Sequence, residues 1–89
     1  MQSKELVLPP KDGLFSKRAV KYFNAEAEKF ASEIYVCSDN RQVRAKSLLG
    51  LLSLNLAGNM EITLITRGPD EEKAMQTMTA LIESGFEST

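Results

Sequence analysis

Two short segments of the chain combine a serine with neighbouring cations, and these are the places where the sequence could do chemistry. Ser16 is followed by Lys17 and Arg18, and Ser47 comes directly after Lys46. A serine hydroxyl can carry a phosphate, and a cation such as Lys46 would meet the added negative charge. Histidine, whose imidazole accepts and passes on phosphoryl groups near neutral pH, is absent from all 89 residues. The sequence therefore allows serine modification and excludes a phosphohistidine.

No other kind of reactive site is indicated. Cys37 is the single cysteine, so it has no disulfide partner within the chain and no neighbours spaced as metal ligands. We expect no metal, no cofactor and no enzymatic activity. The formal net charge of -1 gives no overall field for a polyanion, so nucleic acid is not an expected partner. Apolar runs fall far short of the ~20 residues of a membrane helix, and no secretory signal is visible, so we expect a cytoplasmic protein without a membrane partner.

The apolar spacing predicts a single domain over residues 1–89. Strands are expected where apolar residues alternate or form short runs, over residues 5–8, 33–38, 42–44 and 61–66. Helices are expected to begin after residues suited to the N-cap position, namely Ser16, Ser47 and Asp70. The order β-α-β-β-α-β-α indicates an α+β fold, in which a mainly antiparallel sheet is covered on one face by helices.

Two of the helices show a one-sided apolar stripe that should face the core. The first stripe consists of Val20, Phe23, Ala27 and Phe30. The last consists of Ala74, Met75, Met78, Leu81 and Ile82, and it ends at Gly85. The methionines are expected to fill the core, and Cys37 is expected to be a small strand residue without chemistry.

Residues 45–54 (AKSLLGLLSL) carry the most distinctive pattern in the chain. The order is lysine, serine, two apolar residues, glycine, two apolar residues, serine and leucine, from Lys46 to Leu54. It resembles the regulatory segment of HPr, the phosphocarrier protein of the bacterial phosphoenolpyruvate sugar phosphotransferase system. Residues 13–14, 61–66 and 68–74 lie at the distances that this family expects. The resemblance implies an HPr-like open-faced β-sandwich, with a four-stranded antiparallel sheet covered on one face by three helices.

The chain departs from that family at the phosphorylated histidine. In the family, Gly-Leu is followed by histidine, alanine, arginine and proline, whereas Phe15, Ser16, Lys17 and Arg18 follow here. The phenyl ring of Phe15 has no lone pair to accept a phosphoryl group. A phosphate ester on Ser16 would be too stable for a relay, and the N-cap role explains this serine better. We therefore expect a degenerate site with no catalytic residue.

A basic cluster surrounds the expected start of the first helix. It comprises Lys11, Lys17, Arg18 and Lys21. Cations here oppose the helix dipole, which suggests a docking surface for an acidic partner or an anion. The alternative, which the sequence favours slightly, is a solvated face whose cations cost little free energy. We expect Lys17 and Lys21 to take part in partner binding.

Ser47 has two compatible roles. It is suited to cap the second helix, and the resemblance implies that it is the serine phosphorylated by the ATP-dependent HPr kinase/phosphorylase. By the same analogy, Leu48, Leu49 and Leu52 would form an exposed patch that docks a regulatory protein partner, while Leu51 and Leu54 close the core. The alternative is that all five leucines are buried.

Three functions remain open. The first is a regulatory protein of carbon catabolite control that lacks the relay histidine and acts through Ser47 and the leucine patch, as a histidine-less relative in the family does. The second is an interaction adaptor that is never phosphorylated, because Arg44, Leu48 and Leu49 differ from the residues common in relatives. The third is a phosphotransferase component with another acceptor.

Overall fold

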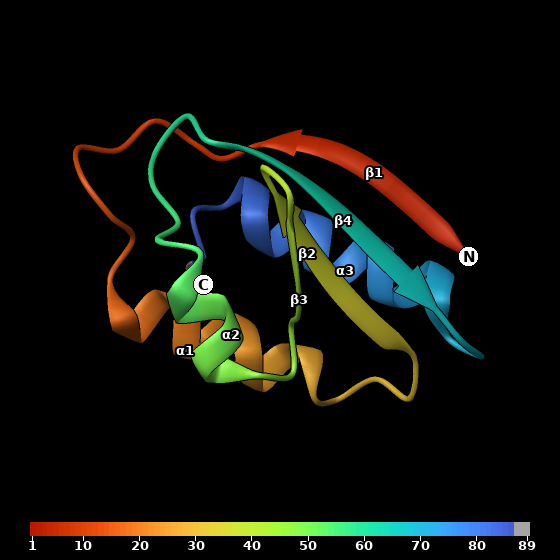
Figure 1. Ribbon diagram of the computed structural model, residues 1–89. Helices are drawn as coiled ribbons and strands as arrows, with labels where there is room; N and C mark the ends of the chain where they lie inside the picture. The colour runs from red at the N-terminus through yellow and green to blue at the C-terminus, as the bar shows by residue number, and fades with distance from the viewer. Residues whose placement is uncertain (87–89) are drawn as a thin grey trace.

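Four strands form one antiparallel sheet, and three helices cover one of its faces (Figure 1). The computed structural model describes residues 1–86. The strands are β1 (Gln2–Val7), β2 (Glu33–Ser38), β3 (Arg41–Arg44) and β4 (Glu61–Arg67), in the order β1-β4-β2-β3. The helices are α1 (Lys17–Ala27), α2 (Leu48–Ser53) and α3 (Glu71–Glu83). The expected α+β fold and element order are confirmed.

Alternation along the strands places one set of side chains in the core. Ile34 and Val36 of β2 are buried, and so are Ile62, Leu64 and Thr66 of β4. Val36 lies opposite Leu64 in the antiparallel register of these two central strands. The helices bury their stripes against this face, with Val20, Phe23 and Ala27 from α1 and Ala74, Met75, Met78, Leu81 and Ile82 from α3.

The element ends differ from expectation by a few residues. β1 begins at Gln2 rather than at residue 5, because Gln2 and Ser3 continue the pairing with Thr66 and Ile65 of β4. α1 ends at Ala27, so Phe30 follows the helix instead of completing its stripe. The N–H groups of Lys29 and Phe30 donate three residues back, to the carbonyls of Glu26 and Ala27, both at 3.2 Å. These tight turns close the end of α1.

Asp70 precedes α3 as expected, but its side chain does not cap that helix. Its carboxylate instead accepts the backbone N–H groups of Ala31 (3.0 Å) and Ser32 (2.9 Å) and a hydrogen bond from the Ser32 hydroxyl. The carboxylate of Glu71, the first residue of α3, accepts the N–H of Gly68 in the preceding loop at 3.1 Å. Asp70 thus joins the loop before β2 to the loop after β4.

The Asp70 contacts should make folding stability depend on pH. The Ser32 hydroxyl, followed by the Ala31 N–H, lowers the pKa of the Asp70 carboxyl below its value in an unfolded chain. A lowered pKa stabilises the fold above the unfolded value of about 4, and this stabilisation is lost as the pH falls through the folded value. We expect the free energy of unfolding, measured with urea, to fall between about pH 6 and about pH 2.5 in both proteins. The fall should be smaller in Asp70→Asn than in wild type.

Asp12→Asn is the control for that prediction, because Asp12 is also an exposed aspartate, whereas the N–H groups of Ala31 and Ser32 donate to Asp70. In Asp12→Asn, folding stability should depend on pH as it does in wild type. Equal pH dependence in Asp70→Asn and wild type would show that the contacts of Asp70 do not couple to folding.

Candidate functional site

Ser47 lies exposed at the start of α2 and caps it. Its hydroxyl oxygen accepts the backbone N–H of Gly50 at 3.2 Å. A Cβ at Gly50 would lie 3.2 Å from both the Ser47 hydroxyl oxygen and the Val43 Cβ, so a larger residue there would crowd both groups. The hydroxyl therefore combines a fixed position at a helix start with access from solvent.

Lys46 is not available to a phosphate on Ser47 in the way the sequence suggested. Its ammonium group donates to the carbonyl of Phe30 at 2.7 Å, beyond the end of α1. The backbone of Ala45 is held nearby, because the Asn24 amide donates to the Ala45 carbonyl at 3.0 Å. Lys46 therefore fastens the segment before α2 to the end of α1.

The five leucines of this segment divide between surface and core. The side chain of Leu49 is 81% exposed, and those of Leu48 and Leu52 are half-buried. Leu51 and Leu54 are buried, and Leu51 is fully inaccessible. The alternative in which all five are buried is therefore wrong. We call Leu48, Leu49 and Leu52 the leucine patch; its role in docking remains a prediction.

The surroundings of the leucine patch carry cations and few anions. Residues 40–60 contain Arg41, Arg44 and Lys46 and no aspartate or glutamate. Lys17 and Lys21 are exposed on α1 and share a helical face with Asn24, the residue bonded to the carbonyl of Ala45. An apolar centre with a basic border favours a partner surface with the opposite charge.

Phe15 belongs to the hydrophobic core rather than to a reactive surface. Its side chain is only 9% exposed. Its ring meets that of Phe86 edge-on, with centroids 4.9 Å apart, and Phe86 meets Phe23 in the same manner at 5.5 Å. Contacts of this geometry stabilise the packing beyond simple burial. The residue expected to mark a degenerate site thus joins the start of α1 to the end of α3.

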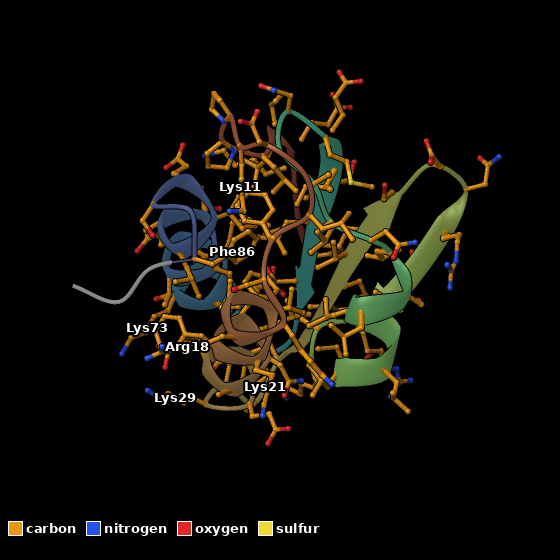
Figure 2. All side chains as sticks on the ribbon, turned by 90° about the vertical axis from the view of Figure 1, so that its left-hand side faces the viewer. Lys11, Arg18, Lys21, Lys29, Lys73 and Phe86 are labelled. Atoms are coloured by element: carbon orange, nitrogen blue, oxygen red, sulfur yellow. The ribbon has the colours of Figure 1, made fainter. Side chains whose placement is uncertain are left out.

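A hollow of about 750 Å³ lies beside Phe15. Lys11 and Arg18 line it together with Tyr22 and Phe86, and the Lys11 ammonium lies 5.9 Å from the centre of the Phe15 ring. Figure 2 shows Arg18 and Phe86 on the α3 side of α1, with Lys21 away from them. The basic cluster expected from the sequence is therefore divided, with Lys11 and Arg18 on the hollow and Lys17 and Lys21 outside it.

Ser16 behaves as the sequence indicated, and it lines the hollow as well. Its hydroxyl oxygen accepts the N–H of Ala19 at 3.1 Å, which is the N-cap bond of α1. This use of the hydroxyl is structural and sufficient to explain the serine.

Phe86 is the contributor to this region that the sequence analysis missed. Its N–H donates to the Leu81 carbonyl at 2.9 Å, and that of Gly85 donates to Ile82 at 3.0 Å. Gly85 and Phe86 both have positive φ, at 76° and 66°. This pair of bonds is the Schellman pattern of a helix end, in which the residue after the glycine folds back onto the helix. An apolar residue directly after a terminating glycine was the available signal.

No second reactive centre is found among residues 1–86. Burial raises the pKa of the Cys37 thiol, which leaves it less reactive at neutral pH. No group of three or more potential metal ligands gathers within this part of the chain. Its helices are also too short or too polar to span a membrane.

Comparison with known proteins places this geometry in a family. A family model described as the phosphorylation site of the HPr component of the phosphotransferase system matches residues 2–84. The chain belongs to the HPr family. The resemblance noted in residues 45–54 is thereby confirmed, as is the implied four-stranded fold with three helices.

Individual members of the HPr family agree with this assignment. The HPr-like protein Crh of Halalkalibacterium halodurans is 42% identical over 83 residues, which cover 93% of this chain and 98% of that protein. The crystal structure of HPr from Thermoanaerobacter tengcongensis matches with a TM-score of 0.88 at 37% identity over the full length of both chains. Crh of Bacillus subtilis, solved as a swapped dimer, matches with a TM-score of 0.73 at 30% identity, covering 93% of this chain and 90% of that one.

Proposed function

We propose that this HPr family member is a regulatory protein of carbon catabolite control rather than a phosphoryl relay. HPr kinase/phosphorylase places a phosphate on Ser47, and the leucine patch docks the kinase and a regulatory protein partner. The chain itself catalyses no reaction and works in the cytoplasm. Similarity to HPr-like Crh proteins supports this function over that of a phosphocarrier.

The observation that carries the proposal is the placement of Ser47 beside the leucine patch. The exposed hydroxyl caps α2, and Leu49, two residues further along the chain, is 81% exposed. A phosphate at a helix start is favoured by the free backbone N–H groups and by the helix dipole. A kinase that covers the leucine patch could therefore reach the hydroxyl without unfolding α2.

The packing of Phe15 supports the loss of the relay. The chain offers no imidazole, and the side chain at the position of the family histidine is buried against Phe86. A relay acceptor must be reached by the active sites of its donor and its recipient. A buried phenyl ring supplies neither the lone pair nor the access.

The experiment that tests the proposed function is incubation with ATP and HPr kinase/phosphorylase. We expect the chain to take up one phosphate. Absence of uptake by folded protein would favour the second candidate, a non-phosphorylated adaptor. The exposure of Leu49 in the leucine patch is compatible with that adaptor, which would bind its partner whether or not Ser47 carries a phosphate.

The leucine patch gives a separate prediction. Because Leu49 is the most exposed leucine of the patch, Leu49→Ala should weaken binding to HPr kinase/phosphorylase about tenfold while leaving the thermal midpoint nearly unchanged. Val7→Ala is the matched control, since Val7 is 60% exposed on β1 at the other edge of the sheet. Equal affinities for the two variants in titration calorimetry would remove the leucine patch from the docking surface.

A further inference from the structure

α2 is too short to be stable without support from the rest of the fold. It spans six residues, Leu48–Ser53, whereas isolated helices below about 12 residues are marginal in water. Ser47 caps its first turn, and Leu51 anchors one side in the core. Its own last turn contains no basic residue to balance the negative end of the helix dipole.

Arg41 supplies that missing cation from β3. Its guanidinium donates two hydrogen bonds to Ser53, the last residue of α2, one to the backbone carbonyl at 2.9 Å and one to the hydroxyl oxygen at 2.8 Å. The Ser53 hydroxyl in turn donates to the Gly50 carbonyl at 2.6 Å. One planar guanidinium thus satisfies a terminal carbonyl and places a positive charge at the end of the helix.

We propose that Arg41 is a positioning residue that holds the C-terminal end of α2, and with it the leucine patch, in the orientation that a partner meets. This inference has a structural half, that Arg41 holds the end of α2, and a docking half, that the orientation of the leucine patch matters to a partner. The docking half rests on the proposed function. The structural half rests on the two bonds to Ser53 alone. Arg41 is distinguished from the other cations near the patch by acting through Ser53 rather than through contact with the partner.

The attachment of α2 to β3 at a second point supports this role. Gly50 lies so close to Val43 that a Cβ at Gly50 would be 3.2 Å from the Val43 Cβ. The middle of α2 therefore rests on β3, and Arg41 ties the end of the helix to the beginning of the same strand. Loss of the Arg41 bonds would free the last turn of α2, which includes Leu52, while Leu51 stays anchored.

Amide hydrogen exchange tests the structural half. The reporter amides are those of Leu54 and Asn55, which donate to Leu51 and Leu52 at the end of α2. In Arg41→Met we expect them to exchange about three- to tenfold faster than in wild type. Arg41→Lys keeps the charge without the two-pronged geometry, so it should give an intermediate rate.

Arg44→Met is the matched control, because it removes the same charge from an exposed arginine of the same strand. It should leave both amides at the wild-type rate. Equal rates in Arg41→Met and Arg44→Met would overturn the inference, as would faster exchange spread equally over α1, which would indicate global destabilisation.

Binding to HPr kinase/phosphorylase tests the docking half. If Arg41 acts through α2, combining Arg41→Met with Leu49→Ala should weaken binding less than the product of the two single effects. A fully multiplicative loss would show that Arg41 does not act through the leucine patch. If wild type does not bind the kinase at all, the proposed function fails, whereas the exchange rates still decide whether Arg41 holds α2.

Discussion

Ser47→Ala is expected to abolish phosphate transfer from ATP and HPr kinase/phosphorylase to this chain. The hydroxyl is the acceptor that we assign to the kinase, and it stands exposed at the start of α2 beside the leucine patch. The substitution also removes the N-cap bond to Gly50, which should cost about 1 kcal/mol of folding free energy. That cost leaves the protein folded under assay conditions.

The chain offers a closely matched control in Ser16→Ala. Ser16 is likewise exposed and likewise caps a helix, through a 3.1 Å bond from the Ala19 N–H. Loss of the Ser16 hydroxyl should cost a similar folding free energy, also about 1 kcal/mol. Phosphate uptake from ATP and HPr kinase/phosphorylase should stay at the wild-type level. Phosphate uptake that survives in Ser47→Ala would assign the acceptor elsewhere and refute the proposed mechanism.

The second large effect is a gain of function at the start of α1. Wild type should take no phosphate from phosphoenolpyruvate and enzyme I, because it has no imidazole. We expect the triple substitution Phe15→His, Lys17→Arg, Arg18→Pro to restore detectable phosphoryl acceptance. The polar imidazole would favour solvent over the apolar contact with Phe86, so we expect it to turn into the open hollow that Ser16 also lines. Proline is tolerated in the first turn of a helix, where the N–H has no helical partner.

Phe30→His separates the effect of position from that of the imidazole itself. Residue 30 lies beyond the other end of α1, so histidine there should accept nothing. A folded triple variant without label would show that more than these positions has been lost from the relay site. The contact with Phe86 identifies the next residue to change, since that ring packs directly on residue 15.

Local patterns were sufficient for the order of the elements and for the helix starts. Ser16 and Ser47 form the N-cap bonds that their positions predicted, and Ile34 and Val36 face the core as the alternation required. Such features depend on residues a few positions apart, so the printed sequence contains the necessary information. The division of the five leucines between surface and core was also anticipated, although only by analogy with the family.

Contacts between distant segments were not predictable in the same way. Asp70 was suited to cap α3 but bonds to Ser32, 38 residues away. Lys46 was expected beside Ser47 but reaches the Phe30 carbonyl, and the guanidinium of Arg41 reaches Ser53. Each side chain could satisfy several partners, and only the packing of the elements selects one of them.

The most direct test of the regulatory role is mapping of phosphate on the protein isolated from the bacterium that produces it, grown on a rapidly used sugar. Peptide mass analysis should find phosphate on Ser47 and on no other residue. Protein that carries no phosphate while HPr kinase/phosphorylase is active in the same cells, or that carries it at another residue, would contradict the proposal that this HPr family member signals through Ser47.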